Sequence, residues 1–406
     1  MAFERIELAE VLAAAEAVAP VDSLDVAGRN LRDRFGARYV SFLFVDVVGR
    51  RLLRVNDTAS TDAASTDTAS PGREDRAEQV PLVGSGVYDE VLRSQKLVRA
   101  PHNGQGQRVL APVTNRGDTI GVLELYLSEA EVTRDVLEQV EEAVHALADV
   151  IVTDRRFTDL YHWGNRTTVV SLAAEIQRQL LPSASACEAT EFTLAGALVP
   201  ASDIAGDTYD YSLDSGVLHV SVTDAMGHDV DASLTATLAV NASRGGRRAG
   251  ADLGEQARQI HQALLDHGRR TFATGQLLRV ALDGSGARVV NAGHPLPLRL
   301  RCGEVEDVDL AVNLPFGVTG TAPYRVQDVD VRPGDRLLFF TDGMQDRDAE
   351  VVDLRALLLD TAAEHPREVV RTMVGAVSDA YGGRPPRDDA TVLCLDWHGP
   401  GSPAHA

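Results

Sequence analysis

Residues 217–239, VLHVSVTDAMGHDVDASLTATLA, are the most informative stretch of the sequence. The first eight residues are rich in β-branched and apolar side chains and end on Asp224, which predicts a strand that finishes on an aspartate. A short glycine-containing turn follows, and the window from Val230 to Arg244 has the apolar spacing of a helix. The stretch therefore predicts a strand, a turn and a helix, with a carboxylate at the end of the strand.

Three other predicted strands also carry aspartates at an end. Asp207 lies at the start of GDTYDYS (206–212), Asp342 ends DRLLFFTD (335–342), and Asp388-Asp389 directly precede ATVLCLD (390–396). Because a sheet can bring distant strand ends to one edge, we expect one acidic cleft. Clustered carboxylates repel unless cations neutralise them, and ligand sets made only of oxygen select Mg²⁺ or Mn²⁺ rather than zinc. The alternative is structural, because a single aspartate at a strand end is a common turn or cap residue.

Composition narrows the classes of function. The 406 residues include 39 Lys+Arg and 60 Asp+Glu, a formal net charge of −21, which argues against nucleic-acid and membrane-surface roles. The three cysteines, Cys187, Cys302 and Cys394, lie far apart, which excludes a disulfide framework and fits a reducing compartment. The acidic N-terminus does not look like a secretory signal, and no apolar run approaches the roughly 18 residues of a membrane span. We expect a soluble cytoplasmic protein of two or three domains.

The N-terminal segment, residues 1–153, alternates helical and strand patterns. A helix is predicted over 21–34, and strands are predicted over 39–47, 51–56, 107–112 and 119–127. Residues 57–71, DTASTDAASTDTASP, contain no large apolar side chain, so we expect a mobile loop there.

A helical linker, residues 154–184, is predicted to continue the last helix of this segment. Apolar residues recur at spacings of three and four from Leu137 to Ile151 and, after an interruption at Trp163-Gly164-Asn165, from Val169 to Leu180. Such a seam suits a dimeric coiled coil, which we favour, or a helix that packs on its own domain. Residues 185–398 combine short strands with three helical windows, as in a mixed α/β domain, and residues 399–406 are predicted to be a disordered tail.

Eight motifs in residues 172–397 carry a specific resemblance. They are LAAEIQRQLLP (172–182), AGDTYDY (205–211), TDAMGHDVDASLTATLA (223–239), FATGQLLRVAL (272–282), NAGHPLPLRL (291–300), LPFGV (314–318), LLFFTDGMQDR (337–347) and DDATVLCL (388–395). In this order they resemble the catalytic domain of the SpoIIE/RsbU-type serine phosphatases, the bacterial branch of the metal-dependent PP2C-like (PPM) family. The N-terminal segment resembles a GAF domain through its helix and strand pattern and its position. The resemblance implies an α+β fold with a GAF-like sensor, a helical linker and a PP2C-like αββα sandwich.

The resemblance also implies roles for the strand-end acids. Asp224 would bridge two Mn²⁺ or Mg²⁺ ions, with the main-chain carbonyl of Ala225 completing one shell, and Asp342 and Asp388 would hold the second ion. Asp207 would be a ligand or a hydrogen-bond partner of bound water, and Asp389 would assist or replace its neighbour. Two such ions activate a bridging water for in-line attack on a phosphoryl group. The glycines near these acids, Gly206, Gly227 and Gly343, would let backbone approach metal and phosphate closely.

Some residues depart from the family pattern or allow two roles. Asp229 stands where the family has a glycine, and it adds a β-carbon and a negative charge near the predicted metals. His228 would be a general acid or a helix cap, and His294 is expected to be structural. Three arginines would dock an acidic partner or form a solvated helix end, namely Arg244, Arg247 and Arg248.

The implied function is a metal-dependent protein serine/threonine phosphatase controlled by its GAF domain. Its substrate would be a phosphorylated STAS-type anti-sigma-factor antagonist, and its sensor would bind a small-molecule ligand. The protein would form a homodimer through the linker helix. The alternative is a catalytically weak or inactive phosphatase fold that acts as a scaffold or receptor. Asp229 favours that alternative, whereas the intact Asp207, Asp224, Asp342 and Asp388 favour the enzyme.

Overall fold

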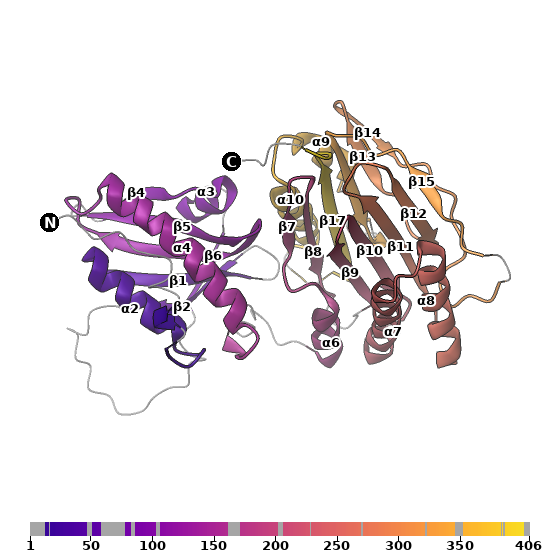
Figure 1. The fold of residues 1–406 in the computed structure, drawn as a ribbon, viewed down its shortest axis with the longest axis horizontal. Coiled ribbons are helices and arrows are strands. Elements are labelled where there is room, and N and C mark those ends of the chain that lie inside the picture. Colours follow the sequence, from indigo (N-terminus) through magenta and orange to yellow (C-terminus); the bar gives the residue numbers. More distant parts are fainter. Residues whose placement is uncertain are drawn as a thin grey trace. The chain divides into compact units, whose positions relative to one another are not determined.

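The computed structural model forms two compact units, Met1–Val169 and Val170–Ala406 (Figure 1). It describes residues 13–15, 17–46, 51–57, 78–82, 86–102, 106–160, 171–201, 206–227, 229–268, 271–320, 323–345, 352–382, 384 and 386–401. Most of the loop predicted over 57–71, and residues 402–406 of the predicted tail, lie outside these ranges. The predicted domain boundaries at 153, 184 and 398 stay predictions.

The N-terminal unit is built on one antiparallel sheet with the strand order β3-β2-β1-β6-β5-β4. Its elements are α2 (Ser23–Phe35), β1 (Tyr39–Val45), β2 (Arg51–Asp57), β3 (Glu78–Pro81), α3 (Val87–Ser94), β4 (Val98–His102), β5 (Gly106–Asn115), β6 (Asp118–Leu127) and α4 (Arg134–Asp154). Helices α2 and α4 pack on one face of the sheet, and α3 lies on the other. Since both faces are covered, β1 and β6 are apolar almost throughout, which explains their continuous apolar sequences.

Local sequence signals set the ends of these elements. Thr133 caps α4 by accepting a hydrogen bond from the backbone N–H of Val136 at 3.3 Å. Arg116 and Gly117 have φ of 46° and 82°, as the tight turn between β5 and β6 requires. The chain therefore reverses direction in a tight turn at residues 115–118.

The C-terminal unit has four layers. Its helices and strands are α6 (Leu172–Leu180), β7 (Ala186–Glu188), β8 (Phe192–Val199), β9 (Asp207–Asp214), β10 (Val217–Ala225), α7 (Asp229–Arg248), α8 (Leu253–His267), β11 (Ala273–Ala281), β12 (Ala287–Ala292), β13 (Leu298–Arg301), β14 (Glu304–Asp307), β15 (Gln327–Val329), β16 (Asp335–Phe340), the 3₁₀ turn η2 (Asp342–Met344), α9 (Leu354–Asp360), α10 (Pro366–Ala380) and β17 (Ala390–Trp397). One sheet has the order β15-β12-β11-β10-β9 and the other β14-β13-β16-β17-β8-β7.

The main core of this unit lies between the two sheets. Leu218 and Val220 of β10 face Phe339 of β16 and Leu393 of β17 across it. Helices α7 and α8 cover the outer face of the five-stranded sheet, and α10 packs on β8 and β17 of the other (Figure 1). This is the αββα arrangement that we expected for the C-terminal part.

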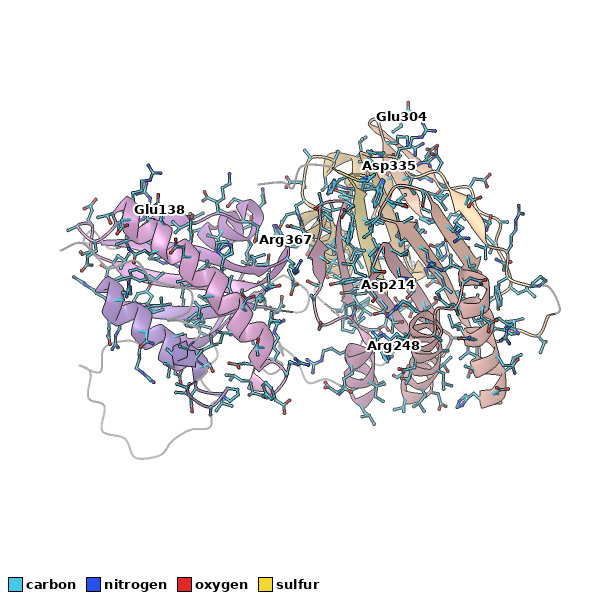
Figure 2. The ribbon with its side chains drawn as sticks, in the orientation of Figure 1. Glu138, Asp214, Arg248, Glu304, Asp335 and Arg367 are labelled. Carbon is cyan, nitrogen blue, oxygen red and sulfur yellow. The ribbon has the colours of Figure 1, made fainter. Side chains whose placement is uncertain are left out.

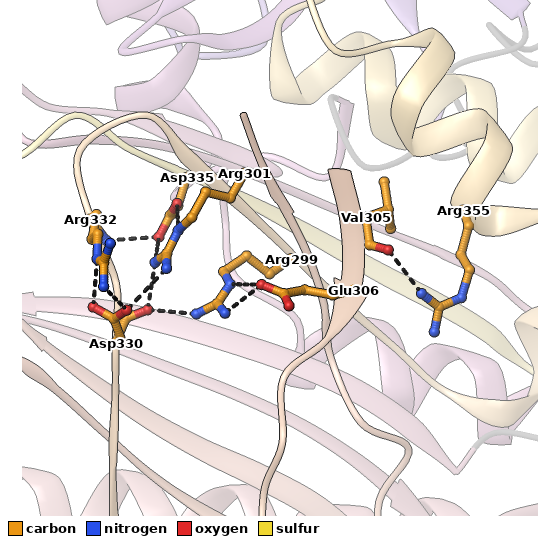
Figure 3. A network of polar contacts seen from close by, with 8 residues as sticks. All are labelled: Arg299, Arg301, Val305, Glu306, Asp330, Arg332, Asp335 and Arg355. Atoms are coloured by element: carbon orange, nitrogen blue, oxygen red, sulfur yellow. Dashed lines mark hydrogen bonds and ion pairs between the residues drawn. The ribbon is translucent and has the colours of Figure 1, made fainter. Parts of the chain in front are cut away.

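A charged network holds the beginning of β16, the strand that leads to Asp342. Arg301 donates two hydrogen bonds of 2.6 Å to the buried carboxylate of Asp335, and a third, of 3.0 Å, to Asp330 (Figure 3). The backbone N–H of Arg332 donates to the same Asp335 at 2.7 Å. Because paired guanidinium and carboxylate groups fix both position and orientation, the start of β16 is firmly held.

The prediction of one long seam for dimerisation is wrong for α4. Val140, Val144, Leu147 and Ile151 are buried in the core of their own unit, against α2 and the sheet. The helix also ends at Asp154, and α6 begins separately at Leu172, with Ser171 as its cap. The predicted hinge at Gly164-Asn165 lies outside the described residues. Among the helices described, none combines the length and the apolar character that crossing a bilayer demands.

Candidate metal centre

The predicted aspartates gather at one end of the sandwich. Asp207, at the start of β9, and Asp224, near the end of β10, are direct partners in the antiparallel register. In the other sheet, β16 ends just before Asp342, and β17 begins just after Asp388-Asp389. Since β16 and β17 are antiparallel neighbours, the end of one lies beside the start of the other. The four strand ends thus meet as the sequence predicted.

Two threonines join the sheets at this point. The hydroxyls of Thr341 and Thr391, both from the β16–β17 side, donate to Oδ2 of Asp207 at 2.6 and 2.7 Å. Thr341 also accepts a 2.9 Å hydrogen bond from the backbone N–H of Thr391. Asp207 is therefore oriented by the opposite sheet, and sequence reasoning missed both threonines. The signal that could have found them is a threonine close to the aspartate at each strand end, since Thr341 directly precedes Asp342 and Thr391 follows Asp389 by two positions.

The electrostatics indicate a crowded set of negative charges. Burial, followed by the charges of Asp342, Asp388 and Asp389, raises the pKa of Asp224 to about 7. Burial, followed by the charges of Asp224 and Asp389, raises the pKa of Asp207 well above its usual value. Both directions are what the removal of water and the repulsion of like charges produce. The carboxylates are close enough to interact strongly.

The donor chemistry fits a hard divalent cation. All the acids at this edge offer carboxylate oxygens, which Mg²⁺ and Mn²⁺ prefer, and a cation would relieve the repulsion that raises the pKa of Asp224. In the positions that their side chains adopt, no three His, Cys, Asp or Glu residues in the described part of the chain are arranged to hold a metal ion.

Asp389 makes several hydrogen bonds to groups around Asp207. Its Oδ1 accepts a 2.8 Å hydrogen bond from the backbone N–H of Ala201, and its Oδ2 accepts from the N–H groups of Gly206 and Asp207 at 3.0 and 3.4 Å. The side-chain amide of Gln177 donates to the same Oδ2 at 2.6 Å. The predicted place of Asp389 in the ligand set stays a prediction, because hydrogen bonds to both oxygens do not test metal binding. Asp389 positions the backbone that carries Asp207.

Gln177 connects α6 to this edge. Besides its bond to Asp389, the same amide donates to the main-chain carbonyl of Asp207 at 2.8 Å. Gln177 is buried, and its neighbours along the inward face of α6 are Ala173 and Leu180. The sequence signal for Gln177 is a polar residue within the apolar stripe of a helix.

The glycines beside the acids allow close packing of backbone. A β-carbon on Gly206 would collide with the carbonyl oxygen of Ala225, and one on Gly343 would collide with that of Asp389. Gly227, with φ of 122°, has a conformation that other residues rarely adopt. Gly206 and Gly343 therefore allow two backbone segments of the protein to lie close together. The close approach of backbone to metal and phosphate at the three glycines stays a prediction.

The remaining candidates lie elsewhere or have structural partners. His294 is buried, and its Nδ1 lies 3.0 Å from the hydroxyl of Thr274, which fits the structural role expected. Asp229 is the first residue of α7, where the backbone is helical, so its position does not require positive φ. His228 lies outside the described residues.

The arginines at the end of α7 are mainly structural. Arg244 and Arg247 both pair with the buried Asp210, at 2.9 and 3.1 Å. Arg244 also donates to the main-chain carbonyl of Leu180 at the end of α6. These contacts leave only Arg248 of the three as an exposed helix-end cation.

Comparison with known families supports the phosphatase part of the resemblance. The family model described as Stage II sporulation protein E (SpoIIE) matches residues 214–398. This match, to a PP2C-type phosphatase domain, includes Asp224, Asp342 and Asp388 and begins after Asp207. It does not reach the N-terminal unit, and no curated protein matches the chain.

Several solved structures are similar to the chain. The RsbU and RsbW domains of Rv1364c from Mycobacterium tuberculosis share 22% identity over 54% of this chain and 62% of that one, with a TM-score of 0.45. The SpoIIE phosphatase domain with a fragment of its regulatory domain, from Bacillus subtilis, shares 13% identity over 74% and 82%, with a TM-score of 0.45. The PPM Ser-Thr phosphatase MsPP from Mycobacterium smegmatis shares 22% identity over 52% and 100%, with a TM-score of 0.40. Likeness at this level does not define an activity.

Proposed function

We propose that the C-terminal unit is a metal-dependent protein serine/threonine phosphatase. The observation that carries the proposal is the meeting of Asp207, Asp224, Asp342 and Asp388 at one edge of the sandwich, in residues that largely fall within the SpoIIE match. The raised pKa of Asp224 supports it, because perturbed carboxylates are frequent where cations or phosphoryl groups bind.

In this proposal the chain supplies an oxygen-lined site for two divalent ions. Asp224 and the carbonyl of Ala225, with Asp342 and Asp388, would hold Mn²⁺ or Mg²⁺, and Asp207 would bind a metal or its water. When bound, such ions lower the pKa of water and neutralise phosphoryl oxygens. Thr341 and Thr391 orient Asp207, and Asp389 and Gln177 hold the backbone beneath it. These residues prepare the site without touching the phosphoryl group.

The partner and regulation are part of the same proposal. The substrate would be a phosphorylated STAS-type anti-sigma-factor antagonist in the cytoplasm, as the SpoIIE/RsbU-type motifs imply. The N-terminal unit would act as a GAF-type sensor with a small-molecule ligand. Its sheet has a buried polar cluster on the α3 side, where Glu124 accepts hydrogen bonds from Tyr39, Tyr88, Arg54 and Arg108. A rigid polar centre of this kind suits a module that must keep its shape while it binds.

The test is hydrolysis of p-nitrophenyl phosphate with and without Mn²⁺ in the parent and in Asp342→Asn. The Mn²⁺-dependent rate of the variant should be more than about 100-fold lower than that of the parent, because a neutral amide replaces a charged ligand. Asp309→Asn is the matched control. Asp309 is exposed, and its replacement removes the same negative charge at another position, so the rate of this variant should equal that of the parent.

The outcomes separate the two candidate functions. A folded Asp342→Asn protein with near-normal turnover would contradict the metal assignment. A parent protein without Mn²⁺-dependent hydrolysis would favour the inactive scaffold, for which Asp229 was the sequence argument.

A further inference from the structure

A cavity lies at the end of the five-stranded sheet that is remote from the acidic edge. It has a volume of about 300 Å³ and is lined by Val217, Arg279, Ala281, Ser285, Gly286, Ala287, Arg288 and Asp328. Val217 begins β10 and Asp224 lies seven residues further along it, so about 23 Å separates the cavity from the acidic edge at 3.3 Å per residue. The volume is at the lower end of the roughly 300–1,000 Å³ typical of ligand sites.

Two arginine side chains line this cavity next to each other and have no hydrogen-bond or ion-pair partner among the described residues. Arg279 of β11 and Arg288 of β12 are directly opposite in the antiparallel register, so their side chains lie on the same face of the sheet. Neither side chain makes a hydrogen bond or an ion pair with any residue that the structure describes. Like charges in directly opposed positions destabilise a sheet. The pair therefore has an electrostatic cost that no hydrogen bond or ion pair of the two side chains offsets within the described residues.

A buried histidine lies beside the arginine pair on the other side of Arg279. His219 is the register partner of Arg279 on the other side and is 7% exposed, and its Nε2 has no hydrogen-bond partner among the described residues. Burial, followed by the charges of Arg279 and Arg247, lowers the pKa of His219 to about 4, so the ring is neutral at pH 7. Figure 2 labels Asp214 and Arg248, the residues at which β9 and α7 end on this side.

Nearby acids compensate the charge only in part. Asp210 is already paired with Arg244 and Arg247. Asp283 accepts from the backbone N–H of Ser285 at 2.8 Å, within the turn before β12. Asp328 of β15 is opposite Arg288 in the register and is the single carboxylate among the residues that line the cavity, which also include two guanidinium groups; Asp214 is a further acid near His219.

We propose that this cavity binds a phosphate-class oxyanion, either free or as the phosphate group of a small molecule. Two guanidinium groups side by side offer planar sets of donors that match the oxygens of a phosphate, and a bound dianion would remove their mutual repulsion. The net charge of −21 opposes the approach of long polyanions, so a small anion fits better than a nucleic acid or an acidic protein. The proposal does not depend on phosphatase activity, because the acidic edge contributes no residue to the cavity.

The experiment is a calorimetric titration of the full chain with inorganic phosphate in EDTA, with chloride at equal ionic strength as the reference. The parent should bind phosphate saturably beyond the chloride effect. Arg279→Gln/Arg288→Gln should weaken this binding by at least about tenfold, since it removes both charge-assisted donor sets. Arg332→Gln/Arg355→Gln is the matched control, with the same change of charge at exposed sites, and should bind like the parent.

Further titrations identify the source of the anion and show whether a loss of binding is due to misfolding of a variant. Adenosine monophosphate that binds as well as inorganic phosphate would identify a phosphate group on a small molecule, and binding of phosphate alone would identify the free ion. Arg288 is exposed, so Arg288→Gln by itself should fold normally and still weaken binding. Asp342→Asn should keep the distal binding even if it loses all hydrolysis.

Three results would overturn the proposal. One is a phosphate response of the parent no larger than that of chloride. Another is full phosphate binding by the Arg279→Gln/Arg288→Gln and Arg288→Gln variants. The third is binding that disappears in Asp342→Asn but persists in the arginine variants, because this would place the anion at the acidic edge.

Discussion

His294 shows how a single buried residue links stability to pH. Burial lowers its pKa from 6.5 to about 4, while the unfolded chain takes up a proton near pH 6.5. Between these values the unfolded state binds more protons, so this share of stability is complete above pH 6.5 and is lost as the pH falls toward 4. The shift corresponds to at most about 3 kcal/mol.

We therefore expect His294→Asn to make the slope of the unfolding free energy against pH less positive between pH 4 and 6.5 than it is in the parent. Asparagine can keep the bond to Thr274 but does not titrate in this range. Urea unfolding at several pH values, in EDTA, measures the slope. His219, whose pKa is also lowered to about 4, contributes a slope of the same sign, whereas Asp224, whose pKa is raised to about 7, contributes a slope of the opposite sign, so His294 is measured by the difference between parent and variant. A slope identical to that of the parent would show that His294 is not the group responsible.

Two glycines give a matched comparison of backbone packing. Gly343→Ala should destabilise the protein by about 1–3 kcal/mol and reduce Mn²⁺-dependent turnover, because its β-carbon would collide with the carbonyl of Asp389. A β-carbon on Gly216 would meet nothing within 4 Å, so Gly216→Ala should change stability by less than about 0.5 kcal/mol. Urea unfolding compares the two, and equal effects would contradict the packing argument.

At the scale of single elements, α6 is tied to the acidic edge through Gln177. Gln177→Ala removes its hydrogen bonds to Asp389 and to the carbonyl of Asp207, so it should cost about 1–3 kcal/mol of stability. It should also weaken Mn²⁺ activation, because Asp207 loses part of its support. The control is Gln179→Ala on the exposed face of the same helix. If both variants need the same Mn²⁺ concentration for half-maximal activity as the parent, α6 has no role in preparing the site.

The apolar residues of α4 and α6 show how much of helix packing can be predicted from their spacing in the sequence. In α4, Val140 and Leu147 face inward as an amphipathic stripe should, but the core they enter is that of their own unit. In α6, Ala173 and Leu180 are buried, while Leu172 is 65% exposed. A spacing of three and four specifies an apolar face and leaves open what covers it.

At the scale of the whole molecule, we predict a homodimer that uses the exposed side of α6. Ile176, half-buried in one chain, and the exposed Leu172 are available for a second copy. Ile176→Asp should lower the mass measured by light scattering and change turnover several-fold, because a charge cannot be buried there without a partner. Gln179→Asp is the control for charge on the same helix. A monomeric parent, or a parent-like mass and rate in Ile176→Asp, would contradict the prediction.

The sequence alone determined most of the local structure and the identity of the acids. Strand and helix patterns, the Thr133 cap and the turn at 115–118 depend on neighbouring residues, so they can be inferred without the fold. The same holds for the aspartates at the ends of β9, β10, β16 and β17, because a strand end is a local feature.

Only the tertiary structure decided how these pieces meet. Asp389 serves the backbone at Gly206, Thr341 reaches across to Asp207, and Arg279 stands opposite Arg288, because strands from distant parts of the chain pair in one particular register. Register depends on how whole faces are buried, and a shift of one residue would move every side chain to the other face. For this reason the acids of the candidate site can be identified from the sequence, whereas their hydrogen-bond partners depend on the fold. The fold also brings together Arg279 and Arg288, whose side chains have no partner among the described residues.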